Sequence, residues 1–63
     1  MNGDALTAAQ VARMVGVHPA VIYKLVRAGQ IGHYRVGGAV RFPREAVDEF
    51  LRRIYRPANQ EVK

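Results

Sequence analysis

The sequence predicts a mainly α-helical fold with one β-hairpin, and three observations support this prediction. Two short amphipathic segments lie about three residues apart, a pair of glycines separates two alternating segments, and another amphipathic segment follows. The chain has 63 residues and no cysteine, so it can form one compact domain without disulfide or thiolate–metal support. We expect that domain over residues 1–55 and a flexible C-terminal tail over residues 56–63.

The first helix is predicted over residues 8–15 because the sequence carries both a start and a stop signal. Thr7 suits an N-cap, and Gln10 lies three residues later, where a capping box has its second partner. Gly16 can adopt the left-handed conformation that ends a helix. We therefore expect the chain to turn sharply at Gly16.

The second helix is predicted from Pro19, at the first helical position, to just before Gly29. Ile22, Leu25 and Val26 recur at the spacing that places them on one face. The short connection to the first helix is typical of a helix-turn-helix. The opposite, exposed face is predicted to carry Ala20, Tyr23, Lys24 and Arg27.

Alternating residues on both sides of Gly37 and Gly38 predict the hairpin. A loop of Gly37, Gly38 and Ala39 would place Arg35 directly opposite Arg41, whereas a loop of the two glycines alone would scatter the apolar residues over both faces. We expect the three-residue loop. Facing guanidinium groups repel each other, and either they splay apart in solvent or a phosphodiester lying across the ribbon binds both.

The third helix is predicted within residues 43–55. Acidic residues gather in its first half, and Arg52 and Arg53 lie in its last turn, an arrangement that suits the helix dipole. These charges therefore have a sufficient structural explanation. Its apolar stripe consists of Val47, Phe50, Leu51 and Ile54.

The charge balance points to a polyanionic partner. Ten Lys and Arg residues oppose five Asp and Glu residues, and nine of these basic residues lie between Arg13 and Arg56. A basic surface that serves only solubility is the alternative. No apolar run approaches the roughly 20 residues of a membrane span, and residues 1–4 lack a secretion-signal pattern. We expect a cytoplasmic protein with no membrane partner.

The sequence offers little for catalysis. It contains no serine or cysteine, and its one threonine, Thr7, is already assigned to a helix cap. Glu45, Asp48 and Glu49 lie on an exposed helix without the apolar enclosure that tunes a carboxyl group for acid–base work. The two histidines form no metal motif, and no glycine-rich phosphate loop precedes a helix. We expect neither an enzyme nor a bound metal or cofactor.

The order helix, turn, helix, hairpin, helix is that of a winged helix-turn-helix. Five segments carry a more specific likeness: TAAQVA at 7–12, VGV at 15–17, VIYKLVRAG at 21–29, YRVGG at 34–38 and RFPREAV at 41–47. In this order and spacing they resemble the excisionase family of MerR-like winged-helix DNA-binding domains, from about Leu6 to Leu51. The chain departs from the family at His18 and Pro19, where members often have Ser and a basic or polar residue, and at Ala39, where the wing tip is often basic. Specificity is therefore expected to depend on DNA shape and on several bound copies.

The resemblance implies that the second helix enters the major groove, that the hairpin is a wing reaching the neighbouring minor groove or backbone, and that the third helix braces both. Excisionases are accessory architectural factors for tyrosine integrases: they bind adjacent sites beside a phage attachment region, bend the DNA and favour excision over integration. The implied partners are double-stranded DNA, a tyrosine integrase and neighbouring copies of the chain, inside a bacterial host cell.

Other functions remain open at this stage. Related transcription regulators usually add a dimerisation helix or effector domain, for which 63 residues leave no room, but a small MerR-like transcriptional regulator is the alternative. A more distant alternative is a module that binds an acidic protein through its basic face. The sequence does not reveal the DNA target, the number of bound copies, the bend angle or the partner.

The predicted site residues follow from this placement. Tyr23 could instead cap the rim of the core, Ala20 could serve helix propensity alone, His18 could be only a cap, and His33 a residue at the base of the wing. Gly37 and Gly38 are explained by loop geometry, with close phosphate approach as a second role. The predicted DNA contacts are His18, Ala20, Tyr23, Lys24, Arg27, Arg35, Gly38, Arg41 and Arg44, and tentative contacts to a protein partner are Arg52, Arg53 and Arg56.

Overall fold

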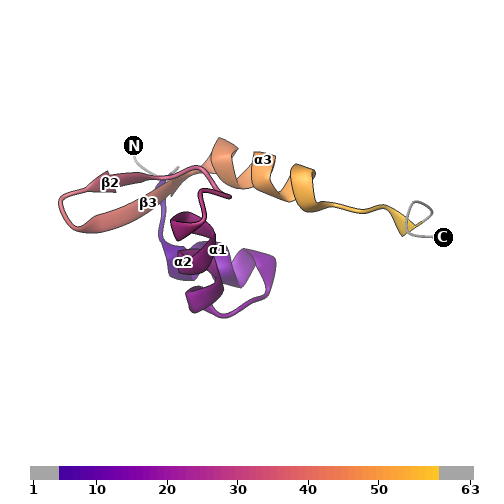
Figure 1. Ribbon diagram of the computed structural model, residues 1–63, viewed down its shortest axis with the longest axis horizontal. Coiled ribbons are helices and arrows are strands. Elements are labelled where there is room, and N and C mark those ends of the chain that lie inside the picture. Colours follow the sequence, from indigo (N-terminus) through magenta and orange to yellow (C-terminus); the bar gives the residue numbers. More distant parts are fainter. Residues whose placement is uncertain (1–4, 59–63) are drawn as a thin grey trace.

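The computed structural model describes residues 5–58 and confirms the predicted winged helix-turn-helix fold, with three helices and a small antiparallel sheet (Figure 1). Most of the predicted tail, residues 59–63, lies outside the described part, as do residues 1–4. Within residues 5–58, every helix is too short or too polar to span a lipid bilayer. The elements are β1 (Ala5–Leu6), α1 (Ala8–Val15), α2 (Pro19–Arg27), β2 (Tyr34–Val36), β3 (Ala39–Pro43) and α3 (Arg44–Ile54).

Helix α1 has the predicted bounds and the predicted caps. The backbone N–H of Gln10 donates to Thr7 Oγ1 at 3.1 Å, and the Thr7 N–H donates to Gln10 Oε1 at 2.9 Å, which completes the capping box. Gly16 has φ +87°, a conformation that costs glycine little. The N–H groups of Gly16 and Val17 then both donate to the Ala12 carbonyl, at 2.7 and 3.0 Å. These bonds turn the chain directly into α2.

Helix α2 is capped by side chain and backbone. His18 is the N-cap, and its Nδ1 accepts a hydrogen bond from the Ala20 N–H at 3.0 Å. At the other end the Gly29 N–H donates to the Val26 carbonyl at 3.0 Å and the Gln30 N–H to the Leu25 carbonyl at 2.9 Å. This pair of bonds is a Schellman motif. It ends α2 beside the predicted Gly29 and directs the chain toward the wing.

The sheet has the order β1-β3-β2, and its hairpin register differs from the expected one. Val36 pairs with Ala39 and Tyr34 with Arg41, so the loop contains only Gly37 and Gly38. The expected three-residue loop is therefore wrong. It assumed that one face of the hairpin is buried, but every residue of β2 is exposed, so no core selects the register there. A two-residue loop matches the natural twist of the strands, and Gly37 supplies the positive φ of +61° that it needs.

Strand β1 was not expected from the sequence. It pairs antiparallel with β3, with Leu6 opposite Phe42, and so fixes the wing to the segment that leads into α1. Phe42 therefore pairs with Leu6 of β1 and not with a residue of β2. Two residues are too few to show an alternating pattern, so no strand could be predicted there.

Helix α3 is one residue shorter at each end than the predicted segment 43–55 and has Pro43 as its N-cap. Val47 and Phe50 are buried and Leu51 is partly buried, as predicted. Ile54 is 46% exposed because the last turn of α3 projects away from the helix pair, on the side opposite the hairpin (Figure 1). The predicted apolar stripe therefore meets the core only over its first part.

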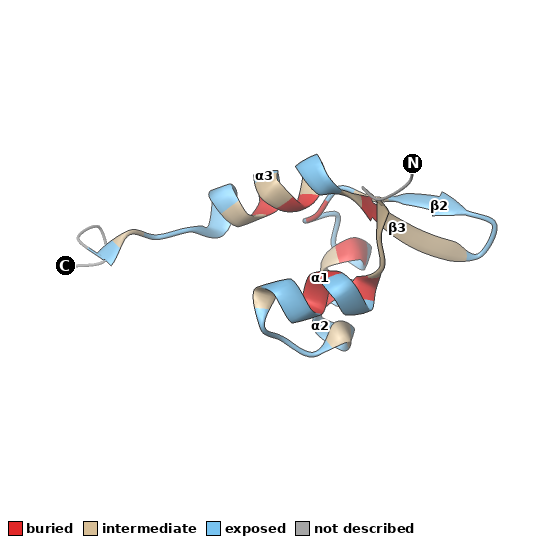
Figure 2. Cartoon of the chain, turned by 180° about the vertical axis from the view of Figure 1, so that it is seen from behind, coloured by how far each residue is buried: buried red, intermediate tan, exposed pale blue. Residues whose placement is uncertain are grey.

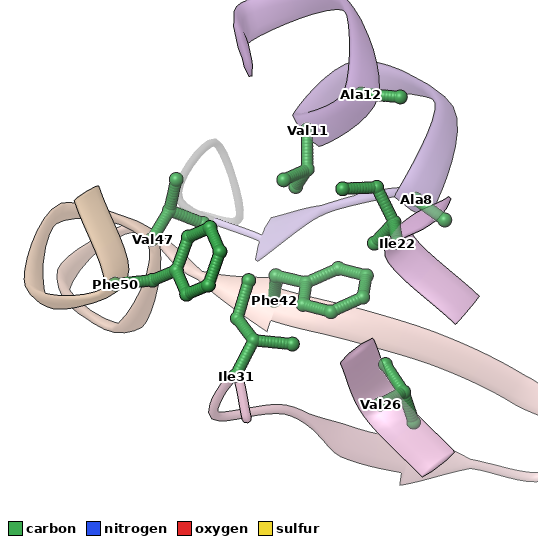
Figure 3. Close-up of a cluster of buried hydrophobic side chains, with 9 residues drawn as sticks. All are labelled: Ala8, Val11, Ala12, Ile22, Val26, Ile31, Phe42, Val47 and Phe50. Atoms are coloured by element: carbon green, nitrogen blue, oxygen red, sulfur yellow. The ribbon is translucent and has the colours of Figure 1, made fainter. Parts of the chain in front are cut away.

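The core lies where α1, α2 and the first part of α3 meet β3. Phe42 is fully buried at its centre, between Val11 and Ile22 on one side and Ile31, Val47 and Phe50 on the other (Figure 3). Figure 2 shows that burial is concentrated at this junction, whereas the hairpin and the end of α3 are exposed. The core cluster consists of Ala8, Val11, Ala12, Ile22, Val26, Ile31, Phe42, Val47 and Phe50.

Candidate nucleic-acid interface

The exposed face of α2 is set by the residues that the helix buries. Ile22 and Val26, one turn apart, pack in the same core cluster as Phe42 of β3. Because side chains on the other side of a helix point away from its buried stripe, this packing turns a continuous face of α2 to solvent. The predicted contacts on that face, Ala20, Tyr23, Lys24 and Arg27, are all exposed.

The N-terminal end of α2 presents one further polar group. His18 is exposed, and because its Nδ1 accepts the Ala20 N–H, the neutral ring carries its proton on Nε2. Nε2–H is therefore a donor directed away from the helix cap. His18 is thus a cap, which was one of the two expected roles, and it keeps one donor for a second role.

Val21 belongs to the same surface but was missed by the sequence reasoning. It is 37% exposed and lies three residues before Lys24, on the same side of the helix. This spacing could have predicted its exposure, because an apolar residue of α2 outside the stripe of Ile22 and Val26 does not face the core. An exposed methyl-bearing side chain can contact a thymine methyl group in the major groove.

The wing places its two arginines on opposite faces. Arg35 pairs with Val40, whereas Arg41 pairs with Tyr34, and neighbouring residues of a strand point to opposite sides. The predicted juxtaposition of the two guanidinium groups is therefore wrong. Val40 packs against the core, as does Phe42 two residues later, so Arg35 lies on the face of the sheet that meets the helices. Arg41 lies on the other face, where its Nη1 donates to the Val40 carbonyl at 2.9 Å.

The loop and the start of α3 hold the remaining predicted DNA contacts. Gly38 is exposed in the hairpin loop. Arg44 forms an ion pair with Asp48, 3.3 Å between Nε and Oδ1, and both side chains are about half exposed. An exposed pair four residues apart on a helix contributes only about 0.3–0.5 kcal/mol, so it does not hold the guanidinium against a phosphate.

The three arginines predicted to contact a protein partner differ in their surroundings. Arg53 donates to the Gln30 carbonyl and lies over the Phe50 ring, 5.7 Å from its centroid. It therefore fastens α3 to the loop that follows α2. Arg56 donates to the Arg53 and Tyr55 carbonyls, both at 3.2 Å, while Arg52 is exposed.

His33 lies at the base of the wing. Its Nδ1 is 3.0 Å from the Ile31 carbonyl, and its ring centroid is 6.4 Å from that of Phe42. The ring is partly buried, so it packs the start of the hairpin onto the core. This is the structural role expected for a residue at the base of the wing.

The described acidic residues are confined to α3, which also carries Arg44, Arg52 and Arg53. Every carboxylate within residues 5–58 lies on α3: Glu45, Asp48 and Glu49. The exposed face of α2 and the inner face of the wing carry Lys24, Arg27 and Arg35 with no acidic residue among them. Nowhere in this range do three or more histidine or acidic side chains cluster as they would around a metal ion. The geometry therefore favours contact with an extended anion along α2 and the wing.

A comparison with known protein families yields a match to this chain. The helix-turn-helix domain family matches residues 5–55, which include all six elements of the fold. Neither the curated proteins nor the solved structures yield a match to the chain.

Proposed function

The chain belongs to the helix-turn-helix domain family, and from this premise we propose that it is an architectural DNA-binding factor of the excisionase type. The family supports sequence-specific DNA binding, and its members are typically non-enzymatic. In the proposed role the protein binds adjacent sites beside a phage attachment region, bends the duplex and directs a tyrosine integrase toward excision.

One observation carries the DNA-binding part of the proposal: α2 buries Ile22 and Val26 in the core cluster and turns Lys24 and Arg27 to solvent. A duplex along this exposed face lies on the helical side of the sheet. Arg35 is on that side, so the helix and the inner face of the wing can meet the same duplex. In helix-turn-helix domains the second helix reads the major groove while flanking groups hold the backbone.

The proposed contacts divide by chemistry. Lys24, Arg27, Arg35 and Arg44 are cationic and bind phosphate or guanine, whereas Ala20 and Val21 offer methyl groups to thymine. Tyr23 and the Nε2–H of His18 are hydrogen-bond donors near the same groove. Gly38 allows the wing tip to approach the backbone closely. Because few of these groups can read base edges, selectivity depends mainly on DNA shape.

The excisionase assignment is supported by the resemblance of residues 6–51 and by the elements that those residues form. Where copies bind adjacent sites, Arg52 of α3 and Arg56 after it contact the integrase or the next copy. A small transcriptional regulator of the MerR type is the alternative with the same DNA-binding surface.

Footprinting tests the proposal. The protein is added to duplex DNA from a phage attachment region, with and without the integrase encoded beside it, and bending is measured on circularly permuted fragments. We expect adjacent protected sites, a bend, and stimulated excision. Protection of a promoter alone, with no effect on recombination, would support the transcriptional alternative, and no protection of any duplex would overturn both.

A further inference from the structure

The exposed face of α2 changes in character along the helix. Its first turn exposes Ala20 and Val21, whereas the turns that follow expose Lys24 and Arg27. All four residues lie outside the buried stripe of the helix. The face is therefore apolar at its N-terminal end and cationic toward its C-terminal end.

The backbone of the first turn offers no free hydrogen-bond donor at positions 19–21. Pro19 has no N–H group, the Ala20 N–H donates to His18 Nδ1 at 3.0 Å, and the Val21 N–H donates to the His18 carbonyl at 2.9 Å. At many helix N-termini such N–H groups bind phosphate. Here they are already used, so these three positions meet DNA through their side chains.

The side chains of this turn also lack the groups that read a base by paired hydrogen bonds. The residues that do so are Arg, Lys, Asn, Gln, Asp and Glu, and Ser and Thr can also bond to bases; none of these occurs in residues 18–23. The Nε2–H of His18 is a donor, but guanine, adenine and thymine all present acceptors to it. Tyr23 follows the buried Ile22 and lies three residues before the buried Val26, so it lies at the edge of the exposed face. Hydrogen bonds from this turn therefore do not single out one base.

Methyl groups are the feature of DNA that the first turn can recognise. In helix-turn-helix domains the N-terminal residues of the second helix contact base edges in the major groove. The apolar group on those edges is the C5 methyl group of thymine, which Ala and other apolar side chains contact. Ala20 and Val21 present methyl groups at this end of α2, while Lys24 and Arg27 farther along suit the phosphates that border the groove.

We propose that the base readout of α2, beside the selectivity that comes from DNA shape, is the recognition of pyrimidine C5 methyl groups by Ala20 and Val21. 5-Methylcytosine carries the same methyl group at the same ring position, so it substitutes for thymine, whereas uracil and unmethylated cytosine do not. Cytosine methylation within a DNA site then regulates binding, because it creates the group that α2 contacts. This inference rests on the proposed function and names the chemical feature of the duplex that the same face recognises.

Replacement of single methyl groups in the duplex tests the inference. A site is selected from random duplexes, and each of its thymines is replaced in turn by deoxyuridine, which lacks only the C5 methyl group. Burial of one methyl group changes an affinity by about fourfold, so we expect a loss of about fourfold at one or two positions and no change elsewhere. At those positions, 5-methylcytosine opposite guanine should bind about fourfold more tightly than unmethylated cytosine.

Protein variants identify the side chains that make the contact. V21S should abolish the difference between thymine and deoxyuridine at one position, and A20G should abolish it at a neighbouring position. Each result is a ratio within one variant, so a general loss of affinity does not affect it. V36S makes the same change as V21S at an exposed position of the wing, on the face that Arg41 shares, and should keep the wild-type ratio. Circular dichroism should show the wild-type fold in each variant.

The other outcomes count against the inference in distinct ways. A selected site without thymine, no loss with any deoxyuridine, or equal affinity for methylated and unmethylated cytosine would overturn it and leave DNA binding standing. A thymine–deoxyuridine ratio that stays at the wild-type value in both V21S and A20G would mean that the methyl group acts through DNA shape, which would also overturn it. No binding to any duplex would instead refute the proposed function.

Discussion

The opposite orientations of Arg35 and Arg41 lead to a prediction that separates the two faces of the wing. On a duplex with a single site, Arg35→Ala should lower affinity for every sequence and weaken its dependence on salt, because it removes a contact to phosphate. Arg41→Ala should leave both properties unchanged, because Arg41 lies on the face turned away from the duplex. The two variants remove the same charge from paired strands of one hairpin, so each is the control for the other.

The magnitude follows from the number of phosphates neutralised. Each phosphate contact contributes about −0.9 to the slope of log affinity against log salt, so the four cationic contacts, Lys24, Arg27, Arg35 and Arg44, together predict about −3.6 if all four meet phosphate. Loss of Arg35 alone should reduce the slope by about 0.9. Between about 50 and 200 mM salt, the wild-type protein should then lose about 3.5-fold more affinity than the variant.

Fluorescence anisotropy with a labelled single-site duplex measures these slopes directly. The folded state of each variant is checked by circular dichroism, which should match that of the wild type because both side chains lie outside the core. If Arg41→Ala lowers the slope as much as Arg35→Ala, or if Arg35→Ala leaves it at the wild-type value, the assignment of the wing faces is wrong.

Lys24→Ala should weaken duplex binding by about 1–3 kcal/mol if Lys24 contacts a base edge. An unchanged gel-shift midpoint would show that α2 does not enter the major groove. Phe42→Ala leaves a cavity at the centre of the core and should lower the free energy of unfolding by about 3–5 kcal/mol. This loss is comparable with the whole stability of about 3–9 kcal/mol expected for a chain of this length. A urea midpoint close to that of the wild type would contradict the observed packing. Thr7→Ala should cost about 1 kcal/mol through loss of the N-cap, and an unaltered melting temperature would show that the capping box contributes nothing.

Features that depend on local physics could be predicted from the sequence. The capping box at Thr7, the left-handed turn at Gly16 and the end of α2 near Gly29 each involve residues within about one turn of one another. The exposed face of α2 was predictable for a related reason, since its buried residues repeat at the helical period. The helices and the exposed positions of most candidate DNA contacts could therefore be predicted from the sequence.

Features that depend on distant contacts could not be predicted in this way. The register of the hairpin is set by its glycine loop and by the pairing of Phe42 with Leu6, and the latter is 36 positions away in the chain. An argument from alternation alone assumed a buried face that β2 lacks. The faces of Arg35 and Arg41 were mistaken for that reason.

The role of Arg53 shows the same limit. Its guanidinium binds the carbonyl of Gln30, 23 positions earlier, and rests on Phe50 of its own helix. In the sequence it is one of two arginines in the last turn of the helix, where the helix dipole already accounts for it. Only the placement of α3 against the loop after α2 reveals the contact.

The central claim is that one duplex contacts the exposed face of α2 and the inner face of the wing together. The most direct measurement is a titration of the isotope-labelled protein with a duplex that holds a single binding site, followed in backbone amide NMR spectra. We predict that the largest shifts fall on residues 20–27 and on Arg35, while Glu49 on α3 stays close to its free position. Shifts concentrated on α3, with α2 unaffected, would contradict the account.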